Sequence, residues 1–290
     1  MKILICSDSS EQAESAVRLG AAIAGGCQAE VTLLGIIELP AESKTVTDSL
    51  ARGLAILQDK KVRTESITRT GKAIEEIIKR TQEAVYDLVV VGAVRKQSRG
   101  AFWMSSKSYK IIKEVTPPVM VVAGKSSSLK HILICSGGKR YIENAVRFTG
   151  EIARGVGSQV SILHVLPETP AIYAHLPRMM DDLDELLRSK SELGTNLREA
   201  NETLEALQVG AEVRLRRGAV LEQILREVHE GDYDLVVVGS TIAHGLTSYA
   251  LGDVTREVVN RTSKAVLVVR TTERAPESQF KLRMLLGRGR

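Results

Sequence analysis

The sequence predicts an α/β protein built from two copies of one domain, each a parallel sheet flanked by helices. Three observations carry this prediction. Short apolar segments rich in valine and isoleucine alternate with segments of helical spacing along the chain, as strands and crossover helices do. These apolar segments lack polar alternation, which is typical of strands buried on both faces. The segment YDLVVVG also occurs twice, at residues 86–92 and 233–239.

Each element of the first copy is placed by its local pattern. Ser9 or Ser10 is the expected N-cap of the first helix, because a hydroxyl oxygen can accept a free backbone N–H of the first turn. Pro117 and Pro118 mark the turn before the last strand. Strands are expected at residues 3–6, 31–37, 62–67, 86–92 and 119–122, and helices at residues 11–24, 45–57, 106–115 and directly after Gly71.

The second copy repeats the first at two different spacings. Lys2 and His131 begin matching strands 129 positions apart, whereas Gly71 and Gly218 stand 147 positions apart. The longer spacing requires 18 extra residues, which we place within residues 178–207. Leucine spacing there predicts one amphipathic helix or a bent pair broken near Gly194. Such a segment is either a packing or partner surface or a longer solvated helix.

The repeat also divides the chain. We predict a first domain at residues 1–124, a second domain at residues 130–271 and a basic tail at residues 272–290. The polar segment KSSSL at residues 125–129 has the composition of a flexible linker. The tail mixes apolar and basic residues, so it either contacts an acidic membrane surface or a partner, or is a frayed terminus or a helix packed on its own domain.

Composition and short motifs narrow the function classes. The 290 residues contain no run of 18 apolar residues and begin directly with a strand, so neither a membrane span nor a signal peptide is expected, and the expected location is cytoplasmic.

The net charge of +5 is dispersed, which favours a solvated surface over a nucleic-acid partner. The three cysteines and five histidines show no metal-ligand or disulfide spacing. Because GxSxG, HExxH and P-loop motifs are missing, no catalytic residue is assigned and an enzyme is not expected.

Candidate ligand sites follow from the predicted sheet. In parallel sheets, ligands bind beyond the carboxyl ends of the strands, where the strand order reverses. A small-residue loop that leads into a helix also offers free backbone N–H groups and a positive dipole end to an anion. In the first copy these positions are residues 7–10, residues 35–38 and the segment after Gly92. In the second copy they are residues 136–139, residues 164–166 and the segment after Gly239.

In these segments the chain resembles the universal stress protein family, in its tandem two-domain form. The resemblance rests on ILICSDSSEQAESAV, on VTLLGII and VSILHV, and on YDLVVVGS followed by LGDVTREVVNRTSKAVLVV. It implies two tandem flavodoxin-like (adenine nucleotide alpha hydrolase-like) domains, each a five-stranded parallel sheet flanked by helices. It also implies a stress-response protein that binds ATP or another adenine nucleotide, with Mg only if ATP is bound.

The resemblance implies a nucleotide site in the first copy. Family members that bind ATP carry the pattern G-x2-G-x9-G-(S/T) after the fourth strand, an aspartate after the first strand and a base contact from the second. Arg95 and Ser105 stand where the family has its second and third glycines. Either basic residues keep a weakened anion site here, or the loop has lost its ligand. The matching positions are Asp8, Ile36, Gly92, Arg95, Ser105 and Ser106.

The second copy departs further from the pattern. Gly137 replaces the aspartate, and Asp253 replaces the hydroxyl residue. A carboxylate at that helix start would cap the helix but repel a phosphate, so we favour a structural role for this copy. The resemblance still makes Val165, Gly239, Gly252 and Asp253 its candidate positions.

The family resemblance also bears on partners. It implies that the last strands, at residues 119–122 and 266–269, pair with each other in an intramolecular pseudo-dimer. A homodimer of the whole chain and an unknown protein partner remain open. The main alternative to nucleotide binding is a nucleotide-independent interaction module. An ATP-dependent adenylating or hydrolytic enzyme is the third reading, suggested by SGGK at residues 136–139 but lacking the acidic and hydroxyl residues that should follow.

Overall fold

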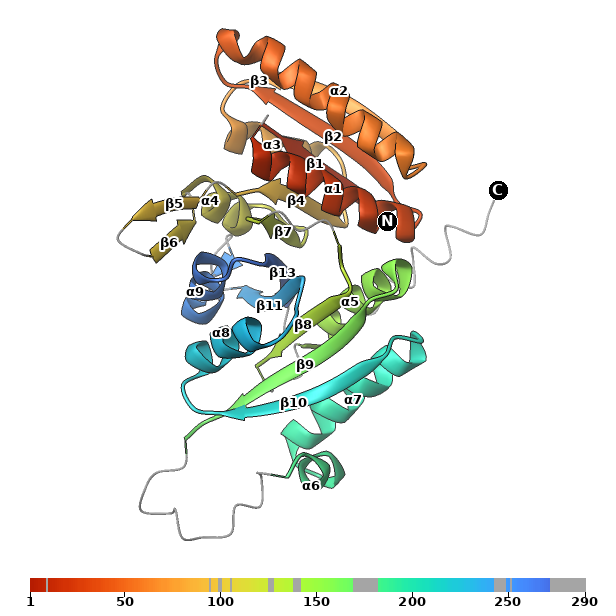
Figure 1. The fold of residues 1–290 in the computed structure, drawn as a ribbon, viewed down its shortest axis with the longest axis vertical. Helices are drawn as coiled ribbons and strands as arrows, with labels where there is room; N and C mark the ends of the chain where they lie inside the picture. Colours follow the sequence, from red (N-terminus) through yellow and green to blue (C-terminus); the bar gives the residue numbers. More distant parts are fainter. Residues whose placement is uncertain are drawn as a thin grey trace.

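The computed structural model describes residues 1–8, 10–93, 95–98, 101–104, 106–124, 128–137, 142–168, 182–242, 249–250 and 252–271. Strands and helices alternate in both halves of the chain, and helices cover both faces of a central sheet (Figure 1). The predicted α/β class and the two flavodoxin-like halves are therefore confirmed. The tail at residues 272–290 lies outside the described part of the chain.

In the first copy, the elements are β1 (Lys2–Ser7), α1 (Glu11–Gly26), β2 (Glu30–Ile37), a short 3-10 helix (Pro40–Glu42), α2 (Ser43–Asp59), β3 (Thr64–Thr70), α3 (Ala73–Glu83), β4 (Leu88–Gly92), β5 (Arg95–Ser98), β6 (Ala101–Met104), α4 (Ser106–Glu114) and β7 (Val119–Val122). Its parallel sheet has the order β3-β2-β1-β4-β7. The chain leaves β1 toward β2 on one side and later adds β4 on the other, so the strand order reverses between β1 and β4.

In the second copy, the elements are β8 (His131–Ser136), α5 (Ile142–Val156), β9 (Gln159–Leu166), α6 (Leu183–Arg188), α7 (Glu192–Ala206), β10 (Ala211–Arg217), α8 (Val220–Glu230), β11 (Leu235–Ile242), β12 (Tyr249–Ala250), α9 (Asp253–Arg261) and β13 (Ala265–Thr271). Its order, β10-β9-β8-β11-β13, repeats that of the first copy. None of the described helices has the length and the apolar character that a membrane crossing needs.

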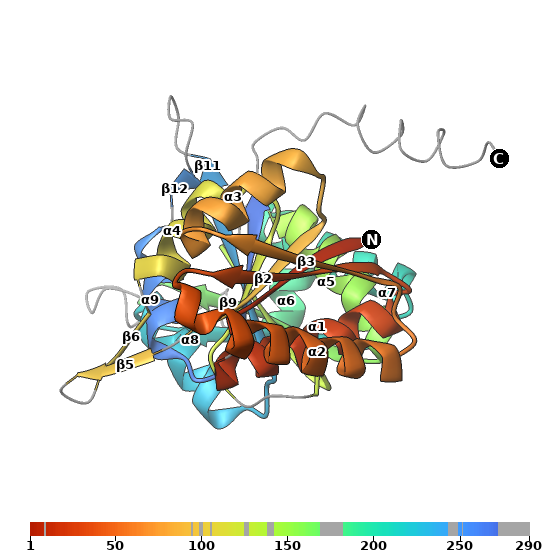
Figure 2. The same cartoon turned by 90° about the horizontal axis from the view of Figure 1, so that it is seen from above.

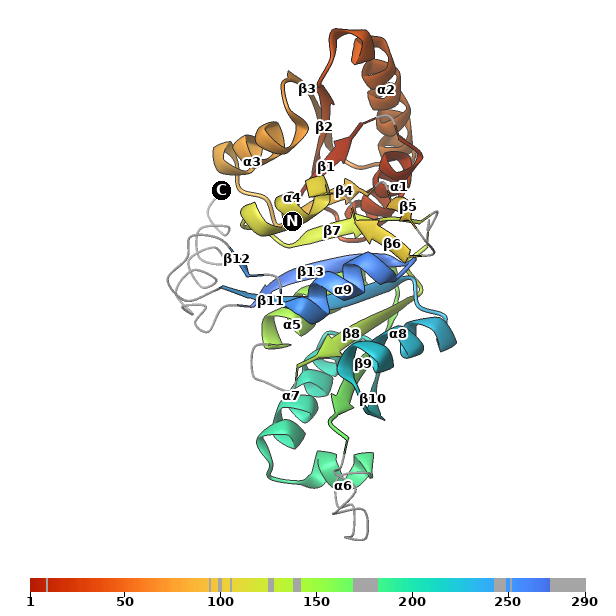
Figure 3. The ribbon, with the colours of Figure 1, turned by 90° about the vertical axis from the view of Figure 1, so that its left-hand side faces the viewer.

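The two sheets join at their last strands. β7 and β13 pair antiparallel, with Val119 opposite Val268 and Val121 opposite Val266. The predicted pairing of the last strands is confirmed, and within the described residues the two copies share one 11-stranded sheet (Figures 1 and 3). The outer edges of this sheet are β3 and β10.

Helices α1 and α5 meet on one face of this junction. Gly26 and Gly155 are equivalent positions in the two copies, and each lies against the other. A Cβ atom at Gly26 would stand 2.7 Å from the carbonyl carbon of Gly155 and closer still to its oxygen. The two backbones can therefore approach this closely only because both residues lack a side chain.

Left-handed backbone positions locate the extra residues of the second copy. Lys61 (φ 54°) and Gln208 (φ 60°) follow α2 and α7, and they keep the longer spacing of the repeat. Helix α7 is therefore the counterpart of α2, and the extra residues lie between β9 and α7, where they include α6. Our range of 178–207 includes α6 but wrongly adds α7, because leucine spacing alone cannot separate an inserted helix from an inherited one.

The break in this segment also differs from the prediction. Helices α6 and α7 are separated at residues 189–191, whereas Gly194 lies in the first turn of α7 and donates its N–H to the Ser191 side chain at 3.0 Å. Leu186 and Leu197 are buried in the core shared by both copies. The described part of the segment is thus a bent pair that packs on its own domain; residues 178–181 lie outside it.

Candidate functional site

The candidate site of the first copy lies at the carboxyl ends of β1 and β4. These strands are neighbours in the sheet, and α1 begins directly after β1. A Cβ atom at Gly92 would stand 2.5 Å from the backbone nitrogen of Ala13 and 2.6 Å from the carbonyl carbon of Gln12. The absence of a side chain at Gly92 thus lets the end of β4 lie against the first turn of α1.

Asp8 is held beside the same helix start. Its Oδ1 atom accepts hydrogen bonds from the Ser10 N–H at 3.1 Å and the Ser10 hydroxyl at 2.6 Å. The Ser10 oxygen accepts the N–H of Ala13, so Ser10 is the N-cap, as one of the two predicted candidates. Because Asp8 is exposed, its carboxylate can accept further hydrogen bonds from a ligand hydroxyl.

The predicted base contact comes from the end of β2. Ile36 is 7% exposed, and its side chain belongs to the core cluster on the α3 face. A ligand at this place would therefore meet mainly the backbone, which is what the family pattern implies. Cys6, one residue before the end of β1, is buried; burial and then the charge of Asp8 raise the pKa of its thiol, so we assign it no chemistry.

Glu38 lies at the edge of the candidate site, and our sequence analysis included it only within residues 35–38. Its Oε1 atom accepts the N–H of Ala73 at 2.9 Å and thereby occupies the N-terminus of α3. The signal available in the sequence was a carboxylate directly after the second strand. Because a carboxylate already satisfies this helix start, a phosphate would be repelled there.

The segment after Gly92 differs from the predicted loop. Strands β5 and β6 form an antiparallel hairpin, with Arg95 opposite Met104 and Lys96 opposite Trp103. This hairpin contacts α9 of the second copy (Figures 2 and 3). Phenylalanine and tryptophan favour strands, and the small-residue pattern of a phosphate loop is missing between the two strands. Arg95 thus lies on a hairpin strand and Ser106 begins α4, while Ser105 lies outside the described residues.

The second copy has a short strand pair at the position of the β5–β6 hairpin, but the helix that follows it begins differently. Thr241 and Ile242 of β11 pair with β12 in the place that corresponds to the hairpin of the first copy. The Thr255 hydroxyl donates to the carbonyl oxygen of Gly239 at 2.8 Å, which links α9 to β11. Sequence reasoning missed this contact, whose signal is a hydroxyl residue in the first turn of α9.

The remaining predicted positions of the second copy lie around this helix start and the end of β9. Gly252 is the N-cap of α9, and Asp253 is exposed, with its carboxylate 3.4 Å from Arg256. Val165 is 8% exposed in the core. Gly137, after β8, is exposed and offers no side chain to a ligand. Gly239, Gly252 and Asp253 thus lie near the start of α9. At the position after the first strand, where the first copy has the carboxylate of Asp8, the second copy has Gly137 and no side chain.

His164 fills a position that is glycine in the first copy. It corresponds to Gly35, where a Cβ atom would stand 2.7 Å from a Leu50 methyl group on α2. The His164 ring donates from Nδ1 to the Ser136 carbonyl oxygen at 3.0 Å. Burial lowers the pKa of His164, and the bond to the carbonyl opposes this only in part, so the ring is neutral at pH 7. The two copies thus differ in their side-chain chemistry at the end of the second strand.

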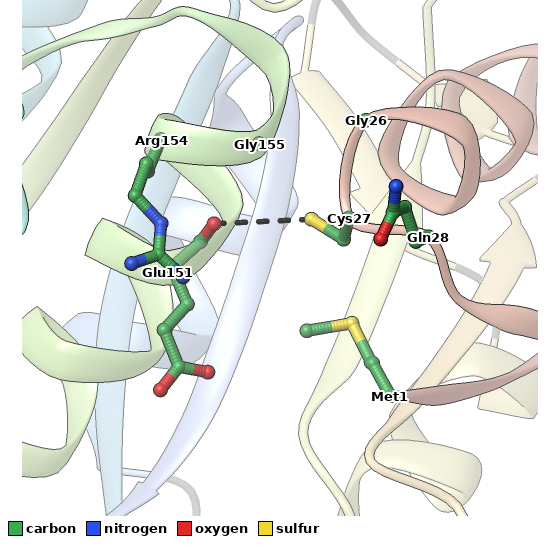
Figure 4. Close-up of a pocket in the computed structure, with 7 residues that line it drawn as sticks. All are labelled: Met1, Gly26, Cys27, Gln28, Glu151, Arg154 and Gly155. Carbon is green, nitrogen blue, oxygen red and sulfur yellow. Dashed lines mark hydrogen bonds between the residues drawn. The ribbon is translucent and has the colours of Figure 1, made fainter.

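A separate pocket of about 280 Å³ lies between the two copies (Figure 4). It is lined by Met1, Gly26, Cys27, Gln28, Glu151, Arg154 and Gly155, none of which is a predicted site residue. The Cys27 thiol points to the Glu151 carbonyl oxygen at 3.8 Å, and burial raises its pKa. The pocket sits where α1 and α5 end, away from the carboxyl ends of the strands, so it is part of the junction between the copies. Within the described residues, no cluster of three His, Cys, Asp or Glu side chains suits a metal ion.

Comparisons with known proteins agree with this architecture. The model of the Universal stress protein family matches residues 1–123 and, a second time, residues 128–270. A universal stress protein from Archaeoglobus fulgidus is 18% identical, with a TM-score of 0.71, over 93% of this chain and 98% of that chain. A putative universal stress protein from Pseudomonas aeruginosa is 17% identical, with a TM-score of 0.66, over 93% of both chains. A universal stress protein solved in complex with cAMP is 26% identical, with a TM-score of 0.36, over 50% of this chain and 99% of that chain. Among curated proteins, none matches the chain.

Proposed function

Because the chain belongs to the universal stress protein family, we propose that its first copy binds an adenine nucleotide and that the protein serves a stress response in the cytoplasm. In this proposal the nucleotide lies beyond the carboxyl ends of β1, β2 and β4 and is held without efficient turnover. The second copy keeps the fold and supplies no nucleotide site of its own.

The observation that carries this proposal is the charge at the helix starts around the site. Helix α1 carries Glu11 and Glu14 in its first turn, and α3 carries Glu75 and Glu76. Helix α2 follows Glu42 as its N-cap residue. The first turns of α2 and α4 both lack an acidic residue, but α4 is not preceded by a glutamate as α2 is. Among the described helices of the first copy, α4 is therefore the one whose positive dipole end is best suited to a phosphate.

The chemistry of a nucleotide fits this distribution. The Asp8 carboxylate would accept hydrogen bonds from ribose hydroxyl groups, and the backbone near Ile36 would contact the base. The phosphates would face Gly92 and the start of α4 at Ser106, where Arg95 and Lys107 are the nearest basic residues in the sequence. A magnesium ion would enter only with ATP, and we assign it no protein ligand.

A second function is favoured by one specific observation. The hairpin of β5 and β6 contacts α9 of the other copy, so the segment that is a phosphate loop in nucleotide-binding relatives serves contact between the domains here. This favours a nucleotide-independent interaction protein, with an unknown partner or a second copy of the chain. The two functions differ in whether the purified chain binds a nucleotide at all.

Isothermal titration calorimetry on the full chain separates them. We expect ATP, added with and without Mg, to bind at one site per chain. Asp8→Asn should weaken that binding by about tenfold, because a hydrogen bond to a charged group contributes roughly 1.5–3 kcal/mol and about 1.4 kcal/mol corresponds to a factor of ten in affinity. Asp48→Asn is the matched control, since Asp48 is exposed on α2. cAMP is the second probe, chosen because one universal stress protein has been solved with it.

Two results would count against the proposal. If neither nucleotide gives heat with the wild-type chain, the nucleotide-binding function is removed and the interaction protein remains. If Asp8→Asn binds as tightly as the wild type, the site is not at Asp8.

A further inference from the structure

Arg270 of the second copy reaches into the first copy. The residue as a whole is buried, with 8% of its surface exposed. The Nη2 atom donates to the carbonyl oxygen of Val115 at 2.7 Å and also to that of Ile112, both at the C-terminus of α4. The Nη1 atom donates to the Ser240 hydroxyl at 2.9 Å, directly after Gly239 on β11. One buried side chain thus joins β11 of the second copy to the C-terminus of α4 in the first.

The contact suits the physical chemistry of a helix end. The last carbonyl groups of a helix have no partner within the helix and carry the negative end of its dipole. The Arg270 guanidinium donates to two of these carbonyl groups and places a full positive charge beside them. Burying this charge costs free energy, which the hydrogen bonds to the α4 carbonyl groups and to the Ser240 hydroxyl offset. Strand β12 of the second copy also contacts α4, so the second copy holds this helix at two places.

The junction is unequal at this point. The repeat places Ala123 at the position in the first copy that corresponds to Arg270, and a methyl group cannot donate a hydrogen bond. The next residue, Gly124, approaches the other copy through its backbone, since a Cβ atom there would stand 2.8 Å from the Ser263 carbonyl oxygen. The second copy therefore caps α4 with a charged side chain, at a position where the first copy has the methyl group of Ala123.

We propose that Arg270 is a positioning residue for the nucleotide site of the first copy. Helix α4 is nine residues long, so it moves as a rigid element, and fixing its C-terminus fixes the N-terminus that would face the phosphates. The second copy then acts as a built-in partner that completes the site it does not itself possess. This inference rests on the proposed function, but its effect on α4 can be measured without a nucleotide.

The test combines hydrogen exchange with calorimetry on the full chain. In Arg270→Met, which keeps the apolar stem and removes the donors, we expect backbone amides at residues 111–115 to exchange at least about tenfold faster, because opening of this helix end costs less free energy. We expect the affinity for ATP to fall by about tenfold, within the range of long-range couplings in proteins. Arg270→Lys should restore part of both effects, because it keeps the charge. Arg147→Met is the control, since its side chain is 50% exposed on α5.

Each outcome decides the proposal. Unchanged exchange at α4 in Arg270→Met would overturn it, and so would faster exchange with unchanged affinity for ATP, because the arginine would then cap α4 without positioning the site. If the wild-type chain does not bind ATP, the proposed function fails and this proposal fails with it, whereas a wild-type chain that binds ATP as tightly as Arg270→Met overturns this proposal alone. Should Arg270→Met fail to fold, Ser240→Ala, which removes one partner of the guanidinium, takes its place in both measurements.

Discussion

Glu227→Ala is expected to lower the free energy of unfolding by about 3–5 kcal/mol, the usual result of removing one partner from a buried ion pair. Glu227 lies on α8 and is 2% exposed. Its Oε1 atom accepts from the Tyr233 hydroxyl at 2.7 Å and from Arg214 at 3.0 Å, and Oε2 accepts from Arg216. Alanine would leave the two guanidinium groups and a buried phenol without their common acceptor.

Urea denaturation of the full chain measures this loss. Glu230→Ala is the matched control, because Glu230 lies on the same helix, pairs with Arg216 and has a side chain that is 54% exposed; an exposed pair contributes about 0–1 kcal/mol. Equal losses in the two variants would show that the burial of Glu227 does not set its contribution.

The same carboxylate makes stability depend on pH. Burial raises the pKa of Glu227, but the hydrogen bonds from Tyr233 and Arg216 and the charges of Arg216 and Arg214 outweigh it, so the pKa lies below its usual value. A group with a depressed folded pKa contributes stability that is present above the unfolded pKa of about 4.3 and is lost as the pH falls through the folded pKa. Glu227→Gln lacks this contribution. The difference in melting temperature between wild type and Glu227→Gln should therefore shrink when the pH is lowered from 7 toward 3.

Gly26→Ala is expected to lower the free energy of unfolding by about 1–3 kcal/mol, because overpacking against a rigid partner is costly. The new methyl group would meet the backbone of Gly155, 2.7 Å away at the carbonyl carbon. Backbone cannot rotate aside as a side chain can, so α1 and α5 would have to separate. This would strain the junction that the paired strands β7 and β13 also hold.

The adjacent glycine gives a sharp control for this second prediction. A Cβ atom at Gly25 would stand 3.4 Å from the Lys60 carbonyl oxygen, which is ordinary contact. Gly25→Ala should therefore be neutral or stabilise the chain by up to about 1 kcal/mol, since alanine favours helices over glycine. The two variants differ by one position and one backbone contact, and melting temperatures of both decide the matter. Similar stability of the two variants would contradict the close crossing of α1 and α5.

Local patterns predicted most of the fold. The apolar runs located the main strands, and the repeated YDLVVVG showed that the two halves share one order of strands and helices. The position of the extra residues could not be predicted in this way, since the leucines of α7 have the spacing of any amphipathic helix, and only the backbone at Lys61 and Gln208 shows which residues correspond.

The candidate site was less predictable because its contacts join distant residues. The cap that Glu38 provides to α3 spans 35 positions, and the hairpin after Gly92 depends on pairing that glycine spacing does not report. In the buried polar network, Arg80 of the first copy donates to Tyr86, whereas the equivalent Glu227 accepts from Tyr233. Such a reversal of charge is compensated by neighbours in space, which a single sequence does not identify. The nucleotide-binding roles of Asp8 and its companions stay predictions until ligand binding is measured.

The antiparallel pairing of β7 with β13 has a consequence for how the two halves could diverge. Each half has an edge strand that would be unpaired on its own. In a protein that must find its partner in solution, such an unpaired edge can pair with another chain and cause aggregation. Here the partner belongs to the same chain, which raises its effective concentration. Selection on one half therefore no longer has to preserve self-recognition by identical surfaces. The second half can therefore carry Gly137 where the first has Asp8, and Arg270 where the first has Ala123. It still has a structural role, because β13 covers the edge that β7 would otherwise leave open.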